Sequence, residues 1–231
     1  MQTPLTPLFV ASVTVSYRLV LARLVWWLST QSSLFIKRTL DVLAVAPALL
    51  LLSPLFLCIA AAIRLEDRGP VFYWQPRVGR NGRTFAFPKF RSMRVDSDVV
   101  RQQIEHLNQH GASVTFKMKK DPRITRVGQW LRRTSLDELP QLWCVLRGDM
   151  TLVGPRPPMV AEVEKYSLAD RRRLSVTPGL TCIWQVSGRS DIPFPQQAAM
   201  DVDYIRDRSL MLDLRLLLAT VPAVLQGRGA Y

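Results

Sequence analysis

Long apolar runs occupy the first third of the chain, and shorter mixed patterns follow. Residues 42–63 include no charged side chain over 22 positions. A straight helix of that length is about 33 Å long at 1.5 Å per residue, which matches a hydrocarbon core of about 30 Å. A buried helix of a soluble protein normally keeps one polar face over such a length. We therefore expect this segment to contact lipid.

A Ser-Pro pair lies at the midpoint of this run. Pro54 follows Ser53 and cannot donate a hydrogen bond to the carbonyl of Leu50, so the sequence predicts a kink there. Basic residues flank the run on both sides, and the positive-inside tendency therefore does not favour ends on opposite faces. These flanking residues are Lys37, Arg38, Arg64 and Arg68. A re-entrant helix-break-helix and a kinked spanning helix both remain open.

Two further segments have membrane character. Residues 9–28 are apolar but contain Arg18 and Arg23, each of which costs roughly 2.5–3.5 kcal/mol at the centre of a membrane helix. We expect a membrane-associated helix of undecided depth. Residues 210–225 are rich in leucine and contain Asp213 and Arg215, a pattern typical of an amphipathic helix at the membrane interface.

The middle of the chain has the patterns of an α+β domain that is mostly helical. Residues 71–74 and 84–90 flank a turn sequence at 79–82, which predicts a small β-hairpin. A short apolar strand is expected after the Pro178-Gly179 turn. Apolar periodicity and polar composition predict four helices, at residues 99–109, 127–133, 139–146 and 159–174.

Charge narrows the classes of function. The chain of 231 residues has 31 Lys and Arg against 18 Asp and Glu, a net charge of +13, and 25 of its basic residues are arginine. Arginine binds phosphate bidentately, so the excess favours nucleic acid, an anionic membrane surface or phosphorylated substrates as partners. A genomic preference for Arg codons explains the ratio of Arg to Lys equally well, but it does not explain the basic excess.

Missing motifs exclude several classes of protein. Cys58, Cys144 and Cys182 are far apart and form no C-x-x-C pair, which argues against a disulfide framework or a cysteine zinc site. The sequence has no P-loop, no Rossmann glycine motif and no G-x-S-x-G. His106 and His110 have i, i+4 spacing without a third ligand, as on an ordinary solvated helix face.

The adjacent carboxylates Asp137 and Glu138 are the sharpest local candidates for chemistry. They follow Arg132 closely and would suit a nucleophile and a metal ligand. The alternative is a capping box, in which the side chains of Ser135 and Glu138 each accept a hydrogen bond from the other's backbone N–H at the start of a helix. Pro140 complicates that alternative, because it would remove a hydrogen bond from the second turn. The local pattern leaves both interpretations open.

Several arginines and their neighbours are candidates for anion binding. Arg156 lies between two prolines that fix the backbone, as a preorganised phosphate clamp requires, although a rigid turn with an incidental arginine is the simpler explanation. The other candidates lie near strand ends and in turns, where a solvated face or a structural turn is the alternative. They are Arg77, Lys89, Arg91, Gln185 and Arg189.

The order and spacing of these segments resemble one known family, the bacterial monotopic phosphoglycosyl transferases that initiate exopolysaccharide, O-antigen and glycoprotein synthesis. The resemblance covers roughly residues 35–231. It rests on K-R-x-x-D (Lys37, Arg38 and Asp41), the Ser53-Pro54 pair, Q-x-R-x-G, KFRSM, SLDELPQLW, GDMTLVGPRP, PGLT-x-x-WQVSGR and LQGRGAY. The chain departs from the family pattern at Cys144, commonly Asn, and at Cys182, usually Gly.

The resemblance implies a reaction in two steps. Asp137 would attack the β-phosphate of a UDP-sugar and release UMP, and undecaprenyl phosphate would then take the sugar phosphate from Asp137. Glu138 would help Asp137 to hold Mg²⁺ and would assist deprotonation of the acceptor. Arg156 would bind phosphate, with Arg132 nearby. The strand-end and turn residues named above are expected to contact the substrate.

The resemblance also implies an organisation. Residues 1–34 would be a membrane-associated leader, 35–66 a re-entrant membrane helix, and 67–231 a catalytic domain with a C-terminal interfacial helix, on the cytoplasmic face of the bacterial inner membrane. The sugar would be a hexose such as galactose or glucose. Membrane lipids are expected partners, a homodimer and downstream glycosyltransferases are further candidates, and nucleic acid is not expected. The alternative is a non-catalytic, basic, membrane-anchored binding or scaffold protein.

Overall fold

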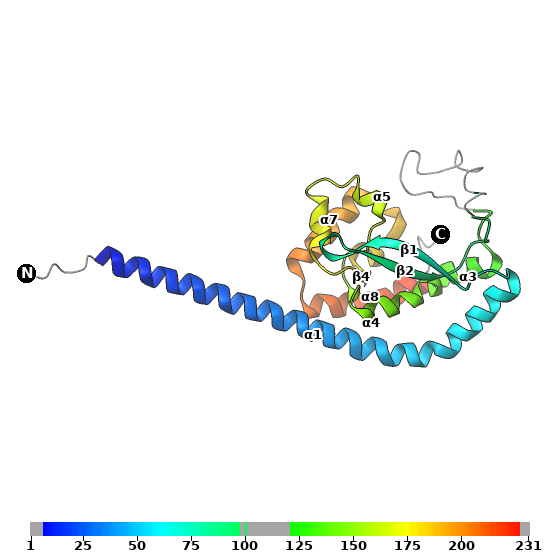
Figure 1. The fold of residues 1–231 in the computed structure, drawn as a ribbon, viewed down its shortest axis with the longest axis horizontal. Helices are drawn as coiled ribbons and strands as arrows, with labels where there is room; N and C mark the ends of the chain where they lie inside the picture. Colours follow the sequence, from blue (N-terminus) through cyan, green and yellow to red (C-terminus); the bar gives the residue numbers. More distant parts are fainter. Residues whose placement is uncertain (1–6, 98–99, 101–120, 227–231) are drawn as a thin grey trace, which may run out of the picture. The chain divides into compact units, whose positions relative to one another are not determined.

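Helix α1 (Pro7–Glu66) accounts for the apolar N-terminal part of the chain in the computed structural model, which describes residues 7–97, 100 and 121–226 (Figure 1). Its first part belongs to one compact unit, Met1–Leu40, and its remainder to a second, Asp41–Tyr231. Residues Ser32–Glu66 are long and apolar enough to cross a membrane, and no other helix in the described segments is. The helices predicted from the two apolar runs are confirmed as parts of α1.

The Ser-Pro pair lies inside α1 without interrupting it. Because Pro54 has no N–H, the carbonyl of Leu50 lacks its usual helical partner. The hydroxyl of Ser53 donates a hydrogen bond of 2.7 Å to that carbonyl. The C-terminal part of α1, drawn in cyan in Figure 1, curves while its secondary structure stays helical. The proline therefore bends the helix and leaves no unpaired carbonyl at Leu50.

The predicted hairpin is confirmed. Strands β1 (Phe72–Val78) and β2 (Thr84–Phe90) pair antiparallel, and the first strand is longer than predicted. The turn between them contains the short 3-10 helix η1 (Arg80–Gly82). Asn81 and Gly82 both have positive φ, at 57° and 79°, the conformation that Asn and Gly adopt most readily in a tight turn.

A second, parallel pair of strands was not fully predicted. Strand β3 (Thr151–Val153) pairs with β4 (Gly179–Thr181), and only the latter was expected. A Cβ atom at Gly179 would overlap the backbone of Gly154, so glycine at this position lets the two segments approach. The residues after β4 form helix α6 (Ile183–Ser187) and do not extend the strand.

The helices around the predicted carboxylate pair are confirmed with one change. Helix α3 (Arg126–Thr134) lies where 127–133 was predicted. The second predicted helix begins as a 3-10 helix, η3 (Leu136–Gln141), and continues as α4 (Leu142–Arg147). The tighter first turn accommodates Pro140, which would otherwise lie inside an α-helix.

The helix predicted over residues 159–174 is wrong. Only its ends are helical, as α5 (Val160–Val163) and the 3-10 helix η4 (Asp170–Ser175). Between them, Ser167 and Asp170 exchange hydrogen bonds between side chain and backbone, at 3.0 and 3.2 Å. Such local bonds compete with helical ones and explain the interruption.

Two longer helices complete the described chain. Helix α8 (Leu210–Gln226) confirms that the C-terminal segment is helical, whereas α7 (Phe194–Asp207) was not predicted. A short 3-10 helix, η5 (Arg189–Asp191), precedes α7. The predicted helix 99–109, with His106 and His110, falls almost entirely outside the described residues. The fold is therefore α+β and mostly helical, as expected.

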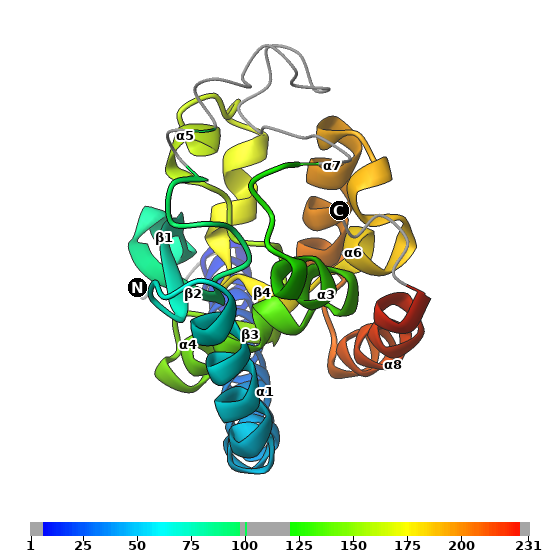
Figure 2. The ribbon, with the colours of Figure 1, turned by 90° about the vertical axis from the view of Figure 1, so that its right-hand side faces the viewer.

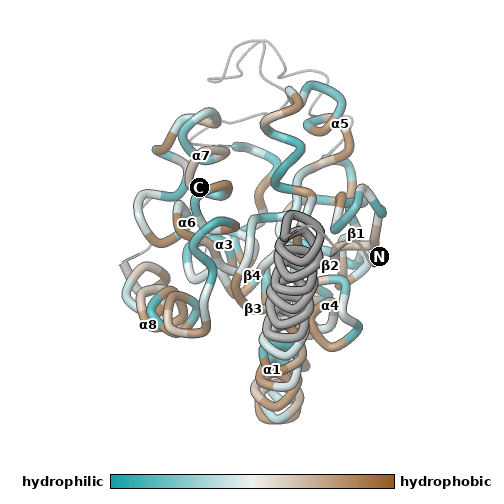
Figure 3. Tube along the Cα trace, turned by 90° about the vertical axis from the view of Figure 1, so that its left-hand side faces the viewer, coloured by the Kyte–Doolittle hydropathy of each residue, from teal (hydrophilic) through white to brown (hydrophobic). Residues whose placement is uncertain are grey.

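The core lies where the second half of α1 meets the hairpin and the α3–α4 segment. Figure 2 shows the cyan part of α1 between β1–β2 and α3. Two buried clusters join these elements: Val45 with Phe87, Leu142, Cys144, Val145 and Met150, and Ile59 with Ile63, Phe90 and Leu131. Figure 3 shows hydrophobic stretches on α1 and α8. The hairpin is thus fixed on the apolar helix by its inward-facing phenylalanines.

Asp41 ties α1 to the parallel strands. Its carboxylate, only 5% exposed, accepts hydrogen bonds from the hydroxyl of Thr151 at 2.5 Å and from the N–H of Leu152 at 3.2 Å. Lys37 and Arg38 of the same motif belong to the unit Met1–Leu40. In the described structure, the Asp41 position of this motif is therefore a structural link to β3.

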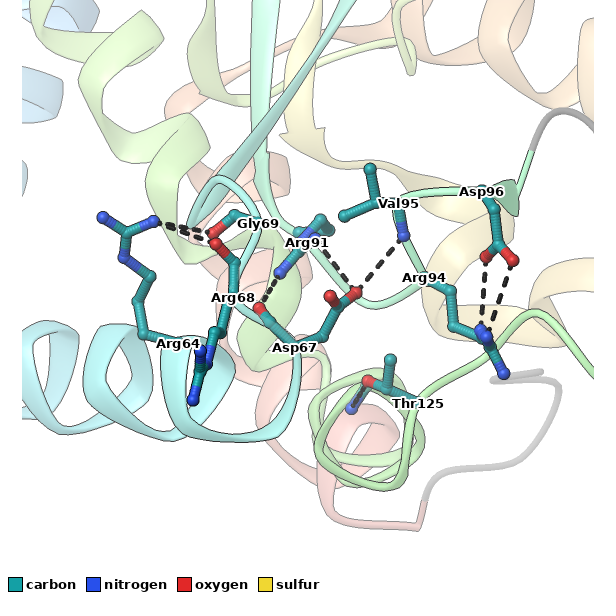
Figure 4. Close-up of polar contacts among 10 residues, drawn as sticks. Arg64, Asp67, Arg68, Gly69, Arg91, Arg94, Val95, Asp96 and Thr125 are labelled. Atoms are coloured by element: carbon teal, nitrogen blue, oxygen red, sulfur yellow. Dashed lines mark hydrogen bonds and ion pairs between the residues drawn. The ribbon is translucent and has the colours of Figure 1, made fainter.

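The end of α1 is held by a group of polar contacts (Figure 4). Asp67 accepts hydrogen bonds from the Arg91 guanidinium at 3.1 Å and from the N–H of Val95 at 3.2 Å. Glu66 accepts hydrogen bonds from the N–H groups of Arg126 and Val127, at 2.7 and 2.9 Å. Its negative charge at the N-terminus of α3 fixes the start of that helix against the end of α1.

Candidate active site

The two carboxylates follow a sharp turn at the end of α3. Ser135 has φ 57° and ψ 17°, a left-handed conformation that redirects the chain into η3. The Ser135 side chain makes no capping hydrogen bond, so the alternative interpretation as a capping box is wrong. Asp137 is buried, and the Glu138 carboxylate faces two cations instead of a helix start.

Glu138 is the centre of a charged cluster. Its Oε1 atom accepts hydrogen bonds from Lys89 Nζ at 2.6 Å and from Arg156 Nη2 at 2.7 Å, and its Oε2 atom accepts one from Arg156 Nη1 at 3.3 Å. Lys89 comes from β2, Glu138 from η3 and Arg156 from the segment after β3. The cluster thus joins three elements that are separated in the sequence.

The cations set the charge of Glu138. Burial alone would raise the pKa of this carboxyl, but Arg156 and Lys89 outweigh burial and hold the pKa well below its ordinary value. In the same contact, Glu138 raises the pKa of Arg156 despite the opposing effect of burial. Glu138 is therefore ionised and paired over the whole physiological pH range.

Asp137 has a different environment. Among the residues that the structure describes, its carboxylate accepts no hydrogen bond, and Lys89 Nζ lies 4.0 Å from Oδ2. Burial raises the pKa of Asp137, with Lys89 opposing the rise and Glu138 adding to it. The two neighbouring carboxylates therefore differ: Glu138 is hydrogen-bonded to two cations, whereas Lys89 Nζ lies 4.0 Å from Asp137 without donating a hydrogen bond to it.

The segment that holds Arg156 is rigid. Pro155 and Pro157 are both fully buried, and the carbonyl of Pro155 accepts a hydrogen bond of 2.9 Å from the N–H of Gly179. Arg77 supports the other side, donating a hydrogen bond of 3.1 Å to the carbonyl of Pro157. These contacts give Arg156 a fixed direction, as the paired prolines predict.

Arg77 itself is enclosed. Its Nη2 atom donates to Gln75 Oε1 at 2.9 Å, and its guanidinium carbon lies 5.3 Å from the centre of the Phe87 ring. Burial, followed by the nearby charge of Arg156, lowers the pKa of Arg77 to about 10. The described hydrogen bonds of Arg77 go to the Pro157 carbonyl and to Gln75, so Arg77 supports the segment that holds Arg156.

Arg132 and Arg189 lie near enough to the two carboxylates for their charges to interact. Arg132 Nε donates to Ser92 Oγ at 2.9 Å; burial lowers its pKa, and Asp137 opposes that effect. Burial likewise lowers the pKa of Arg189, and the negative charge of Glu138 opposes that effect. Arg189 has φ 53°, a left-handed conformation that is uncommon for a residue other than glycine. Both guanidinium groups thus lie close enough to contribute positive charge to the site.

Other predicted residues have different neighbours. Gln185 Oε1 accepts a hydrogen bond of 3.0 Å from the thiol of Cys182, and burial raises the pKa of that thiol. The guanidinium of Arg91 is bound to Asp67 at the end of α1, and the described contacts do not join it to Asp137 or Glu138. Ser53 and Pro54 lie in α1, in the bend described above.

The structure also shows residues that sequence reasoning missed. Ser92 orients Arg132, and the Phe87 ring lies within 5.3 Å of Arg77 and 5.7 Å of Lys89. Gln141 is fully buried, and its amide atoms have no hydrogen-bond partner within the described part of the chain. The KFRSM and SLDELPQLW motifs contain Ser92 and Gln141, so membership in these motifs was the available signal.

The site offers limited ligands for a metal ion. Within residues 7–97, 100 and 121–226, no group of three or more His, Cys, Asp or Glu side chains is placed to hold one. Mg²⁺ is commonly held by one or two carboxylates, with substrate phosphates and water supplying the other ligands. Asp137, whose oxygens accept no described hydrogen bond, fits that mode of binding, and the adjacent Glu138 would join it by exchanging a contact with Lys89 or Arg156 for the metal.

Comparison with known proteins identifies the family. A model of the family described as bacterial sugar transferase matches residues 32–227, nearly the whole of this chain. The chain belongs to the bacterial sugar transferase family. Together with the apolar helix Ser32–Glu66, membership in this family indicates a membrane-associated protein.

Three relatives in the bacterial sugar transferase family illustrate its range. The exopolysaccharide production protein ExoY of Rhizobium meliloti is 45% identical over 198 residues, 84% of this chain and 88% of ExoY. The galactosyl transferase CpsE of Streptococcus agalactiae is 46% identical over 200 residues, 86% of this chain and 44% of CpsE. The undecaprenyl-phosphate galactose phosphotransferase of Salmonella typhimurium is 40% identical over 219 residues, 94% of this chain and 46% of that protein. The chain therefore spans most of one relative and less than half of two others.

Proposed function

We propose that this protein transfers a sugar-1-phosphate from a UDP-sugar to undecaprenyl phosphate. The observation that carries the proposal is the contrast between Asp137, buried with no described hydrogen bond to its carboxylate, and Glu138, paired with Lys89 and Arg156. A reactive carboxylate beside fixed cations is suited to phosphoryl transfer, which depends on positioning and charge stabilisation. The names of the relatives support the class of acceptor and galactose as one donor sugar.

In the first step, a carboxylate oxygen of Asp137 attacks the β-phosphorus of the UDP-sugar. The bond from that phosphorus to the bridging oxygen breaks, and UMP leaves with the bridging oxygen. The sugar-1-phosphate remains on Asp137 as an acyl phosphate. Arg156 and Lys89 stabilise the charge that develops on the phosphoryl oxygens, since both already lie at the adjacent carboxylate.

In the second step, a phosphate oxygen of undecaprenyl phosphate attacks the same phosphorus. The bond to Asp137 breaks, the carboxylate is restored, and the product is a sugar linked to undecaprenyl diphosphate. Glu138 takes the proton of a protonated acceptor phosphate at the moment when substrate phosphate replaces it as partner of Lys89 and Arg156. When Mg²⁺ is bound by Asp137 and Glu138, it supplies further neutralisation of diphosphate charge.

The proposal includes a place in the cell. The apolar segment Ser32–Glu66 and its basic flanks support attachment to the inner membrane, with α1 re-entering the leaflet from which it came and the catalytic part on the cytoplasmic face. The donor is a hexose, galactose or glucose, and the product is the first lipid-linked intermediate of a polysaccharide. A homodimer and contact with the next glycosyltransferase belong to the same proposal.

Release of UMP tests the proposal directly. Membranes containing the protein are given a panel of UDP-sugars with Mg²⁺ and undecaprenyl phosphate, for the wild type, Asp137→Asn and the control Asp203→Asn, an exposed carboxylate on α7. We expect one sugar to release UMP, and Asp137→Asn to lower the rate by roughly a thousandfold or more. Without acceptor, the peptide containing Asp137 should gain the mass of a hexose phosphate less one water.

Two results would contradict the proposal. Silence of the folded wild type across the panel would favour a non-catalytic binding or scaffold protein. UMP release that persists in Asp137→Asn, without a mass gain in the wild type, would keep the reaction but remove the covalent intermediate on Asp137.

A further inference from the structure

An apolar pocket lies between the bent part of α1 and helix α3. Its volume is about 480 Å³, within the range of roughly 300–1,000 Å³ that is typical of small-molecule sites. Its lining residues are Leu55, Cys58, Ile59, Ala62, Arg126, Val127 and Trp130. None of them belongs to the charged cluster around Glu138, so the pocket is a separate feature.

The lining indicates a hydrocarbon ligand. Four of the residues come from the membrane helix, and the floor continues into the buried cluster through Ile59, which is 3% exposed. Trp130 is 51% exposed, as is typical of an indole at the boundary between lipid and water. Arg126 is the only charged lining residue, and it is exposed, so its guanidinium can remain in water while its stem covers apolar surface.

The pocket is connected to the reactive carboxylate by a short stretch of chain. Trp130 lies four residues before Thr134, the last residue of α3, a distance of about 6 Å along the helix axis. The apolar cluster below the pocket also includes Leu136, the residue that immediately precedes Asp137. A chain lying along α3 from the pocket would therefore run toward the turn that leads into Asp137.

We propose that this pocket holds the isoprene units nearest the phosphate of the polyprenyl phosphate acceptor. The inference rests on the proposed function, because it assigns a place to the acceptor of that reaction. A single hydrocarbon chain with a terminal phosphate matches the sequence of surfaces: apolar walls from α1 and α3, then Arg132 at the end of α3, then Asp137. A bilayer phospholipid is the competing occupant and is an outcome of the test.

Adjacent alanines on α1 offer a matched pair of variants. Ala62 lines the pocket, whereas Ala61 is exposed and does not. Ala62→Phe should raise the KM for undecaprenyl phosphate by roughly tenfold or more, the factor that corresponds to losing about two buried CH₂ groups, and Ala61→Phe should not. Both proteins must still release UMP in a single turnover without acceptor, which shows that the donor site is folded. Equal KM values for the two variants would overturn the assignment.

Cys58 provides a second test that does not depend on catalysis. It is the exposed member of the three free cysteines, and Cys144 and Cys182 are buried. Its modification by a thiol-reactive maleimide should be slowed several-fold by undecaprenyl phosphate added to phosphatidylglycerol vesicles, and Cys58→Ser should take up no label. Equal slowing by extra phosphatidylglycerol would assign the pocket to bilayer lipid and overturn the proposal. Protection without any UMP release would support the pocket while contradicting the proposed reaction.

Discussion

The charge of a single side chain, Lys89, influences both carboxylates of the site. It lies 2.6 Å from Glu138 and 4.0 Å from Asp137, and it lowers the pKa of each. In the proposed mechanism Asp137 must be ionised to attack, so activity should be present above its pKa and be lost as the pH falls through it. Because Lys89 opposes the rise in that pKa, the lysine extends activity toward lower pH.

Lys89→Met should therefore move the acidic limb of the pH profile to higher pH. The pKa values of Asp137 and Glu138 both rise when the cation is removed, and single-turnover UMP release as a function of pH measures the change. The exposed Lys165 provides the control variant Lys165→Met, which should leave the limb in place. A limb that stays where it is, or moves to lower pH, in Lys89→Met would contradict this description of the site.

Arg77 should act by positioning Arg156. Arg77→Lys keeps the positive charge but loses the paired hydrogen bonds to the Pro157 carbonyl and to Gln75. Hydrogen bonds to charged groups contribute about 1.5–3 kcal/mol, so we expect kcat for UMP release to fall roughly 10- to 100-fold. If Arg77 bound substrate instead, KM for the UDP-sugar would rise while kcat stayed constant. Steady-state kinetics separates the two outcomes.

The sequence was enough to predict which residues of the site carry chemistry, but not which of them contact one another. The Asp137-Glu138 pair and the proline-framed Arg156 are visible in the sequence. The contact of Glu138 with Lys89 joins residues 49 apart, and the contact with Arg156 joins residues 18 apart. Local patterns carry no information on such distances, which is why the capping box and the ion cluster could not be distinguished.

Helix α3 depends on a close approach at Gly128. A Cβ atom there would overlap the carbonyl of Ser92, the residue whose hydroxyl orients Arg132. Helix propensity alone would make Gly128→Ala stabilising by about 1 kcal/mol. The overlap should reverse the sign, and we expect the substitution to destabilise the protein by roughly 1–3 kcal/mol and to lower UMP release.

The neighbouring position supplies the control. Gln129 lies on α3, is exposed, and should tolerate Gln129→Ala with a change within about 0.5 kcal/mol. Thermal unfolding of both variants in the same membrane mimetic makes the comparison. A rise in Tm for Gly128→Ala would show that α3 does not need its present distance from Ser92.

Elements with strong local signals were predictable. The hairpin has alternating strands and a turn with Asn81 and Gly82, and both features are local. The helix predicted over 159–174 failed because the Ser167–Asp170 bonds compete with helical ones. Strand β3 has only three residues and exists through its pairing with β4, which is distant in sequence. A strand of three residues that forms by pairing with a distant segment is too short to show the alternation that predicts strands from sequence.

For the whole molecule, the proposed topology makes a prediction about the ends of the membrane segment. Cysteines introduced at Ser33 and at Arg68, on opposite sides of the apolar run, should both be protected from an impermeant thiol reagent in intact cells. Both should react once the membrane is opened. Labelling of one position alone in intact cells would show a spanning helix, and Cys58→Ser removes the exposed native thiol from the measurement.

The hydrogen bond from Ser53 to Leu50 has a consequence for the solvent that the bend can tolerate. A proline in a membrane helix frees a carbonyl, which a neighbouring helix, an ordered water molecule or a Ser or Thr side chain can pair. Here the partner is the chain's own hydroxyl, one residue before the proline. The bend at Pro54 therefore needs no water molecule to pair the Leu50 carbonyl. In the proposed re-entrant topology, a Ser-Pro pair therefore lets a membrane helix bend in hydrocarbon while it pairs the Leu50 carbonyl from its own sequence.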